Sequence, residues 1–400
     1  MRSVKRKVDA CTEEAPTARS TLKKIIVNEG WRFVPHSYAC VNMWQCLELI
    51  RRDDVELYHR DLPYLKTEWT PSYRLFDAES TAALGALKAP DPAVHPEVLY
   101  RIDYPYNLAP VKAQRHFVFG TTEHGVVRPT MLAGNGDLPA QLAASDAVIV
   151  TPSNWSRAGF LRSGAPEERV IVVPHGVRED IFRPFAAADR DAVRKQMGWG
   201  DEFVVLSIGT MIGNKGIRYL LKAFAVVQQR HPRMKLCLKG LDGLYPSQQC
   251  LKECGDLLTR EEAARLQASL VYIGETLSFH EMAALYNACD LYASPYMAEG
   301  FNLPVLEAAA CGLPVICTAG GPTDDFIDDS FADRIASTPL HAAGGVMGLD
   351  PSLEHLVALL TRTMERGVSR EVKEAAAGWV RERYTWRHAV DKLLAAFSAR

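Results

Sequence analysis

Two glutamates, Glu299 and Glu307, are separated by the seven residues GFNLPVL. The apolar run at 291–294 predicts a strand that leaves its sheet shortly before Glu299. Pro304 suits the first turn of a helix, so we expect Glu307 in that first turn and Glu299 in the loop before it. Glu299 would then lie over the mouth of a cleft at the carboxyl end of the sheet, and Glu307 would lie at the wall of that cleft. Backbone N–H groups at the helix start would face an anion placed there.

Each glutamate also has a simpler interpretation. A glutamate such as Glu307 often only complements the dipole of its helix, and Glu299 could be a solvated loop residue. The intervening GFNLPVL favours a binding role for both.

A second segment, IGTMIGNKG at 208–216, joins a strand end, a glycine loop and a helix start. Glycines let backbone approach a ligand closely, and Lys215 places a cation beside a helix N-terminus. It is not a P-loop, because three residues separate Gly209 from Gly213 and Gly216 follows the lysine. The segment predicts a phosphate-facing loop with one cation, although a surface lysine before a helix is common.

A third glycine turn, VICTAGGPTDD at 315–325, would complete a phosphate-facing rim. No dinucleotide fingerprint is present, since Gly134-Asn-Gly136 lacks the third glycine. We find no Asp-x-Asp placed to hold a divalent metal on a diphosphate. We therefore expect Lys215 and helix termini to meet the phosphate charge, with Asp324 and Asp325 the first suspects if a metal is needed.

The elements that must position these loops alternate between strand and helix. Continuously apolar runs, typical of strands buried on both faces, lie at 24–27, 147–151, 170–173, 203–208, 235–239 and 314–317. Amphipathic stretches separate them; apolar residues recur at helical spacing in 217–227, for example. The alternation predicts an α/β protein with parallel sheets.

A chain of 400 residues exceeds the size at which one core keeps growing, so we expect two domains. The strand ending in PHGV at 174–177, followed by a polar helix and a fresh strand at 203, places the division near 174–200. The predicted parts are a basic tail (1–22), an N-terminal domain (23–176), a C-terminal domain (177–378) and a terminal helix crossing back (379–400). Ligands would bind in the cleft between the facing carboxyl edges of the two sheets.

Composition argues against several function classes. Hydrophobic residues make up 48% and charged residues 24%, with a net charge of −2, so no global field attracts nucleic acid or an anionic membrane. No run of 18 apolar residues is present. The basic start, MRSVKRKVDA, is expected to be a solvated tail; the alternative is a weak anchor to anionic lipid.

The nine cysteines are better explained as buried reduced thiols of a cytosolic protein than as disulfides. Cys250 and Cys254 are four apart on an expected helix, but no second Cys/His pair lies nearby, which argues against zinc. We expect a cytoplasmic protein, at most peripheral to the inner face of a membrane.

EGFNLPVLEAAACGLPV resembles the signature of the retaining family 4 glycosyltransferases, which have the GT-B fold of two facing Rossmann-like domains. Further matching segments are TPSNWSRAGFLRSG, VIVVPHGV, GTMIGNKGIRYLLKAF and VYIGETLSFHEMAALYNACDLYASPYMAEGF. The similarity covers about residues 145–390 in order, whereas the N-terminal half resembles the family loosely.

The resemblance implies roles for individual residues. Glu299 would contact the hydroxyls of the donor sugar, Glu307 the nucleotide ribose, Lys215 the diphosphate and Ile273 the base. His124, in TTEHG, resembles the N-domain histidine near the reacting sugar, although it could be a polar turn residue. The implied catalytic residues are Glu299, His124 and Lys215. The implied donor-binding residues are Gly209, Thr210, Gly213, Asn214, Lys215, Gly240, Ile273, Glu299, Gly300, Phe301, Asn302, Leu303 and Glu307.

Two departures from the family pattern matter. Thr210 stands where the family often has arginine, so the second phosphate cation is unidentified; Arg218 is one substitute. The family's N-terminal Gly-Gly loop is also missing, and NEGWRFVPHS at 28–37 occupies its place. Gly30, His36 and Ser37 are the candidates for lining the cleft from that side.

The resemblance implies transfer of a hexosyl unit, with retention, from a nucleotide-diphosphate sugar to a hydroxyl acceptor. We expect no tightly bound cofactor, no required metal and no nucleic-acid partner. UDP is favoured over GDP. The expected acceptor is a glycan, a lipid-linked molecule or a small molecule. The alternatives are a sugar-nucleotide epimerase or phosphorylase of the same architecture, and a non-catalytic sugar-nucleotide-binding protein.

Overall fold

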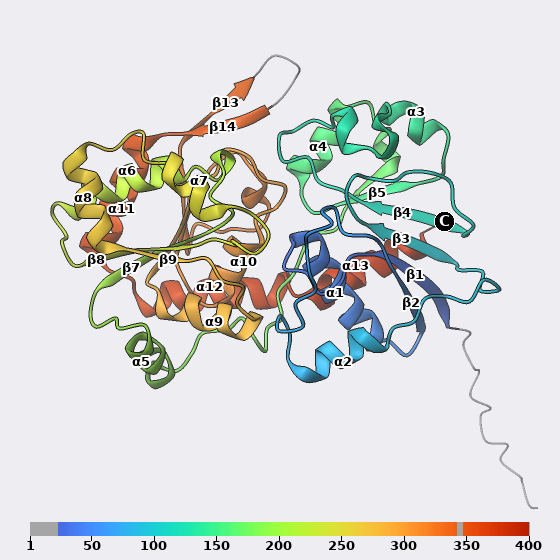
Figure 1. The fold of residues 1–400 in the computed structure, drawn as a ribbon, viewed down its shortest axis with the longest axis horizontal. Helices are drawn as coiled ribbons and strands as arrows, with labels where there is room; N and C mark the ends of the chain where they lie inside the picture. Colours follow the sequence, from blue (N-terminus) through green and yellow to red (C-terminus); the bar gives the residue numbers. More distant parts are fainter. Residues whose placement is uncertain (1–22, 342–346, 400) are drawn as a thin grey trace, which may run out of the picture.

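The structure, a computed structural model, describes residues 23–341 and 347–399. The basic tail predicted for 1–22 lies outside these residues. Two lobes, each built on its own six-stranded sheet, sit side by side (Figure 1). The predicted α/β class with two parallel-sheet domains is confirmed.

The N-terminal sheet is parallel throughout, in the order β2-β1-β3-β4-β5-β6. Its apolar strands are covered on both faces, as β3 illustrates with five buried residues. The strands are β1 (Lys24–Gly30), β2 (Val55–Asp61), β3 (Val98–Ile102), β4 (Arg115–Phe119), β5 (Val148–Thr151) and β6 (Val170–Val172).

The C-terminal sheet is also parallel, in the order β12-β11-β10-β7-β8-β9. Its strands are β7 (Phe203–Ile208), β8 (Met234–Lys239), β9 (Leu270–Ile273), β10 (Leu291–Ser294), β11 (Val315–Thr318) and β12 (Ala332–Ile335). A separate antiparallel pair, β13 (Ser337–His341) and β14 (Met347–Pro351), projects from this lobe (Figure 1).

Each sheet has a point where the strand order reverses. The chain builds β7, β8 and β9 outward and then returns to place β10 on the other side of β7. In the N-terminal sheet the same reversal lies between β1 and β3. The loops that follow two such neighbouring strands leave a crevice between them, which is where open parallel sheets bind ligands.

Helices connect the strands in both lobes. The N-terminal lobe contains α1 (Ser37–Ile50), α2 (Ala78–Ala86), α3 (Leu138–Ala143) and α4 (Asn154–Arg162). The C-terminal lobe contains α5 (Ala187–Gln196), α6 (Ile217–Gln228), α7 (Ser247–Glu253), α8 (Arg260–Ser269), α9 (Phe279–Ala288), α10 (Leu303–Ala310) and α11 (Leu353–Arg366).

The last two helices, α12 (Arg370–Arg383) and α13 (Trp386–Ser398), run along both lobes (Figure 1). The two helices are separated by the non-helical residues Tyr384 and Thr385. The single helix predicted for 379–400 is therefore the end of α12 followed by α13. α13 packs on α1, and Phe397 contacts an aromatic ring of β3 and one of β4. At the crossing, Val177 exchanges backbone hydrogen bonds with Tyr384 and Trp386. The chain therefore passes twice between the lobes at one place.

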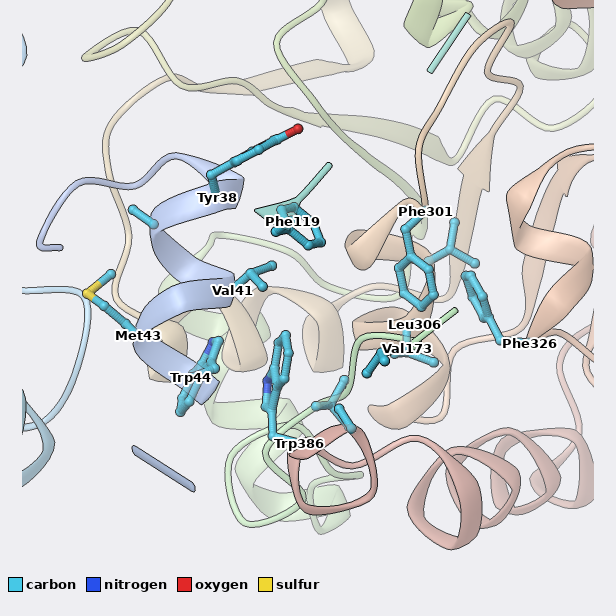
Figure 2. Packing of buried hydrophobic residues seen from close by; sticks show 14 of the residues in the cluster. Tyr38, Val41, Met43, Trp44, Phe119, Val173, Phe301, Leu306, Phe326 and Trp386 are labelled. Atoms are coloured by element: carbon cyan, nitrogen blue, oxygen red, sulfur yellow. The ribbon is translucent and has the colours of Figure 1, made fainter. Parts of the chain in front are cut away.

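One cluster of buried apolar side chains extends through both lobes. Figure 2 shows part of it, from Trp44 of α1 through Phe119 and Trp386 to Phe301 and Leu306 of the C-terminal lobe. Phe301 stacks on Phe326 with ring centroids 4.6 Å apart. The lobes thus share apolar packing close to the loop that carries Glu299.

None of the helices within the described residues has the length and hydrophobicity that a bilayer-spanning helix needs. The cysteines described by the structure are all free, and most are buried.

Candidate functional site

The loop after β7 places Lys215 at the reversal point of the C-terminal sheet. Gly213–Lys215 forms one 3-10 turn, and Gly216 then adopts a left-handed conformation with φ 65°. A Cβ at Gly216 would lie 1.8 Å from the carbonyl oxygen of Pro295, so only glycine lets this loop pack on the loop after β10.

The loop after β10 carries Glu299 toward that lysine. The backbone N–H groups of Met297 and Ala298 both donate to the carbonyl of Asn214, and the Asn214 amide donates to the Ala298 carbonyl at 3.1 Å. With the two loops joined in this way, Lys215 Nζ lies 2.6 Å from Glu299 Oε1. The structure therefore brings together two predicted residues that are 84 positions apart.

This ion pair is largely removed from water, with 19% of the Lys215 side chain and 10% of the Glu299 side chain exposed. Burial raises the pKa of Glu299, and the nearby Glu123 carboxylate adds to this, against the pull of Lys215. Burial opposes the charge on Lys215, but Glu299 and Glu123 outweigh it and raise the pKa of the lysine. Because Glu299 lies 2.6 Å from the Lys215 ammonium and Glu123 also favours its charge, we take the Lys215–Glu299 pair as charged.

The helix after Glu299 begins at Leu303, with Pro304 in its first turn. Asn302 adopts a left-handed conformation (φ 77°) just before it, and its amide donates to Ser294 Oγ at 3.0 Å. With this start, no acidic residue lies in the first turn. The expectation that Glu307 lies in the first turn was wrong. The helix starts at Leu303, one residue before the proline, and this places Glu307 just beyond the first turn.

Glu307 accepts a hydrogen bond from the Tyr286 hydroxyl of α9 at 2.7 Å. Burial raises the pKa of Glu307 to about 7, although the Tyr286 bond favours the ionised form. The carboxylate is thus oriented by a tyrosine that was not anticipated.

The N-terminal lobe contributes the loop after β4. The Asn214 amide approaches Glu123 Oε2 at 3.3 Å, and so a carboxylate of one lobe meets the Lys215 loop of the other. His124, half-buried beside it, has its pKa lowered by burial, with Arg128 and Lys215 adding to the effect and Glu123 opposing it. His124 is therefore close enough to Lys215 for that ammonium to affect its pKa, and its role near the reacting sugar stays a prediction.

The loop bearing Glu299 is held by the N-terminal lobe at the next residue. The Gly300 carbonyl accepts hydrogen bonds from Ser153 Oγ at 2.6 Å and Ser156 Oγ at 3.2 Å. A Cβ on Gly300 would lie 2.8 Å from the Cβ of Thr121. Closure of the lobes and the position of this loop are thus linked through one glycine.

Of the three candidates on the N-terminal side, His36 is the one whose side chain lies near a residue of the other lobe. Its ring centroid lies 6.3 Å from that of Tyr245, and burial lowers its pKa to about 4. Ser37 is exposed at the start of α1. Gly30 is packed inside its lobe, since a Cβ there would meet the Ile102 carbonyl at 2.6 Å. It does not present a surface to the crevice.

The remaining donor candidates lie at the carboxyl ends of β7, β8 and β9. Gly209 and Thr210 follow β7 directly, and Lys215 packs back over Gly209. Gly240 donates its N–H to the carbonyl of Ile273 at 2.8 Å, which fixes these two strand ends together. Arg218 pairs with Asp256 at 2.6 Å, so it does not lie free to replace the missing arginine.

Besides Tyr286, three further residues of this region were not predicted from the sequence. Glu123 directly precedes His124, and that adjacency was the available signal. Tyr245 influences Lys215 from the loop after β8, a contact without a local sequence pattern. Lys239, at the end of β8, is 3% exposed, and its ammonium donates to the Gly240 carbonyl; burial lowers its pKa to about 8.

The carboxylates suspected of metal binding have other partners. Asp325 accepts from the backbone and side chain of Asn154 across the lobes at 2.6 and 3.1 Å. Asp324 accepts from the Gly320 N–H and from Arg334. Asp189 and Asp191, an Asp-x-Asp pair, lie on α5. Across residues 23–341 and 347–399, no three histidine, cysteine, aspartate or glutamate side chains gather as a metal site would require.

Residues 189–342 match the family model described as "Glycosyl transferases group 1". D-inositol 3-phosphate glycosyltransferase of Mycobacterium tuberculosis is 29% identical over 254 residues, which are 63% of this chain and 48% of that protein. The chain therefore spans about half the length of the curated relatives it matches.

Two solved structures are similar over nearly the whole chain. HepE of Anabaena, in complex with UDP and glucose, aligns with a TM-score of 0.64 and 15% identity, covering 94% of this chain and 99% of that one. Sucrose-phosphate synthase of Thermosynechococcus elongatus aligns with a TM-score of 0.64 and 17% identity, covering 94% and 98%. At these identities the likeness concerns the fold. Residues 189–342 are thus similar to the glycosyl transferases group 1 family, and the chain has the two-domain GT-B fold.

Proposed function

We propose that this chain is a retaining glycosyltransferase that moves a hexosyl unit from a nucleotide-diphosphate sugar to a hydroxyl acceptor. The observation that carries the proposal is the Lys215–Glu299 pair at the reversal point between β7 and β10, faced by Glu123 from the other lobe. A cation for a diphosphate and a carboxylate for sugar hydroxyls meet where open parallel sheets bind ligands. UDP is favoured over GDP as the nucleotide, and similar solved structures that contain UDP support this choice.

In the proposed reaction, the bond from the anomeric carbon to the diphosphate breaks as the acceptor oxygen bonds that carbon on the same face. The acceptor proton passes to the leaving phosphate. Lys215 and the backbone N–H groups after β7 and β10 stabilise the charge on the diphosphate. Glu299 orients the sugar, Glu307 binds the ribose, Ile273 and Gly240 border the base, and His124 lies near the reacting sugar. No divalent metal is required in this scheme.

The domain roles follow the same scheme. Residues 177–378 would bind the donor and residues 23–176 the acceptor, with 379–400 joining the two. Closure of the lobes would exclude water and so limit hydrolysis of the donor. The free, mostly buried cysteines suit the cytoplasmic location proposed from the sequence.

The test compares two lysines in similar surroundings. Lys222 pairs with Glu262 at 2.7 Å, with 22% and 8% of the side chains exposed, which resembles the Lys215–Glu299 pair at 19% and 10%. Lys215→Ala should weaken UDP binding about 10- to 150-fold, because a charged hydrogen bond contributes roughly 1.5–3 kcal/mol. Lys222→Ala should bind UDP as the unmodified protein does. Calorimetric titration with UDP, GDP and ADP measures both; equal affinities for the two variants would contradict the proposed site.

Acceptor-dependent release of the nucleotide distinguishes transfer from other uses of the site. A transferase releases UDP faster when a hydroxyl acceptor is added. An epimerase converts the sugar nucleotide to its epimer without net release of UDP, and a binding protein does neither. Activity should persist in EDTA. Loss of activity in EDTA, restored by Mg²⁺ or Mn²⁺, would show that a metal is required after all.

A further inference from the structure

The N-terminal lobe has a hollow of about 540 Å³ beyond the carboxyl ends of β1 and β2. Its lining includes Arg32 and Phe33 after β1, Asp61 at the end of β2, and Tyr64 and Tyr73 from the segment that leads to α2. The volume lies within the range of small-molecule sites. The proposed transfer reaction does not use these residues.

The segment that forms the outer wall, residues 62–77, contains no helix or strand. Connections of this length in a compact domain are uncommon and usually functional. It is nevertheless firmly attached, because the Trp31 indole donates to the Pro63 carbonyl at 2.8 Å and the Tyr64 hydroxyl donates to the Arg32 carbonyl at 2.7 Å. The walls of the hollow are therefore fixed before any ligand arrives.

Phe33 supports the same conclusion through its backbone. It adopts φ 59°, a left-handed conformation that a bulky side chain rarely takes and that costs free energy. The conformation places its ring centroid 4.8 Å from that of Tyr73, which is 61% exposed. Two aromatic rings are thus held together at the surface of one hollow, where they remain available for stacking.

The polar part of the lining is a neutral pair. Arg32 Nε and Nη2 donate to the two oxygens of Asp61 at 2.7 and 2.6 Å, and 59% of the Asp61 side chain is exposed. Arg32 Nη1 also donates to the Leu84 carbonyl, and only 9% of the Arg32 side chain is exposed. Two guanidinium N–H groups and the lone pairs of the exposed Asp61 carboxylate remain for a further ligand. With the charges balanced, the pair suits a neutral ligand with hydroxyl groups better than a phosphate or a carboxylate.

Pyranose sugars match this combination. The C–H groups on one face of the ring stack on aromatic side chains, while the hydroxyls around its edge donate to carboxylates and accept from guanidinium groups. The tilted rings of Phe33 and Tyr73, beside the Arg–Asp pair, provide both kinds of contact at once.

The segment that forms the outer wall of the hollow also reaches the other lobe near Lys215. Trp69, from the same segment, packs on Tyr245 of the other lobe with ring centroids 6.2 Å apart, and Lys66 lies over the same ring at 5.8 Å. Tyr245 is in turn close enough to Lys215 to influence its charge. The hollow and Lys215 are thus connected through this segment and Tyr245.

We propose that the hollow is a saccharide subsite that binds the non-reacting end of an oligosaccharide acceptor, by stacking on Phe33 and Tyr73 and by hydrogen bonds to Arg32 and Asp61. The inference rests on the proposed transferase function, for which it names the acceptor class.

The test measures sugar binding and nucleotide binding separately on the full chain. Saturation-transfer NMR with maltose, cellobiose and lactose as probes would be recorded for the unmodified protein, Tyr73→Ala and Tyr73→Phe. Leu65→Ala is the control, because Leu65 is an exposed apolar residue of the same segment, 43% exposed, outside the lining. Calorimetry with UDP is run on the same samples.

We expect at least one disaccharide to bind, Tyr73→Ala to reduce its affinity at least about fivefold, and Tyr73→Phe and Leu65→Ala to leave it within twofold. UDP affinity should be the same in all four proteins. The proposal is overturned if no disaccharide binds, if Tyr73→Ala binds as well as the unmodified protein, or if only a phosphorylated sugar such as glucose 6-phosphate binds. Failure of UDP to bind any of the proteins would instead contradict the transferase function, whatever the sugars do.

Discussion

Lys215 is shared between two carboxylates from different lobes, and this arrangement shapes what a donor must do. Glu299 holds the ammonium at 2.6 Å, and Glu123 approaches through Asn214. A diphosphate brings more negative charge to the same cation, so it competes directly with Glu299. We expect Glu299 to be released from Lys215 when the donor binds, which would free it to contact the sugar.

The two site glutamates should fail in different ways when their charge is removed. Glu299→Gln changes contacts to the reacting sugar, where charge develops, so it should mainly lower kcat. Glu307→Gln loses a charge that accepts from ribose hydroxyls, so it should mainly raise the KM for the donor. Steady-state kinetics of both variants measures the difference.

Both variants must be shown to fold, because Glu299 is only 8% exposed and its substitution could disturb the packing around it. Circular dichroism of both variants checks it. A reversed pattern would exchange the two roles. A change below about threefold in both, roughly 0.7 kcal/mol, would place the site elsewhere.

Glu307 should also leave a signature in stability. Its pKa is raised to about 7 in the folded protein, above the ordinary value of 4.5, so the folded state holds the proton to higher pH than the unfolded state does. The stabilisation is fully present below about pH 4.5 and is lost as the pH rises toward 7. Relative to Glu307→Gln, the unmodified protein should therefore lose about 1–3 kcal/mol between pH 4.5 and pH 8.

Urea unfolding of both proteins across this pH range, without nucleotide, measures that difference. Since every other titrating group is common to the two proteins, the difference isolates Glu307. Parallel curves would show that Glu307 ionises at an ordinary pKa in the fold.

At the scale of elements, the site depends on two loops that pack on each other beyond β7 and β10. Gly216 is the closest point, because its missing side chain leaves room for the Pro295 carbonyl. The neighbouring Gly213 has open space where a Cβ would be. One loop thus offers a constrained and an unconstrained glycine three residues apart.

Gly216→Ala should lower the midpoint of thermal unfolding and weaken UDP binding, because a Cβ meets backbone at 1.8 Å in a left-handed conformation. The expected loss is at least about 1 kcal/mol, more than an ordinary glycine substitution costs. Gly213→Ala serves as the stability control and should unfold within about 0.5 kcal/mol of the unmodified protein. Similar unfolding of both variants would mean that the two loops do not pack as described.

At the scale of the whole molecule, the lobes meet at the loop that carries Glu299. Ser153 and Ser156 of the N-terminal lobe hold the Gly300 carbonyl, and Thr121 lies against the Gly300 Cα. The buried apolar cluster that continues through both lobes supports this closed arrangement (Figure 2).

Gly300→Ala should disfavour closure, since the new Cβ would lie 2.8 Å from the Thr121 Cβ. We expect a lower kcat and a larger radius of gyration by small-angle X-ray scattering in the presence of UDP. Adding Thr121→Gly should restore much of both, whereas Thr121→Ser keeps the Cβ and should not. If Thr121→Ser restored closure as well as Thr121→Gly, the steric explanation would fail.

Local patterns in the sequence indicated β1, β5, β6, β7, β8, β10 and β11, the helix at 217–227 and the loops after β7 and β10, but not β2, β3 or β4. Continuous apolar runs, helical spacing at 217–227 and the glycines and prolines around Lys215 and Glu299 act over a few residues, so contiguous sequence carries them. The same locality explains the error at Glu307, since the chain gives no signal that distinguishes a helix start at Leu303 from one at Pro304.

The tertiary structure decided which of these loops meet. The contact of Lys215 with Glu299 spans 84 positions, and Glu123 reaches the same place from the other lobe. Such distances depend on the strand order of each sheet and on how the lobes close, neither of which is encoded within one segment. The hollow at Phe33 and Tyr73 arises in the same way, from two separate loops whose aromatic residues have no periodic pattern.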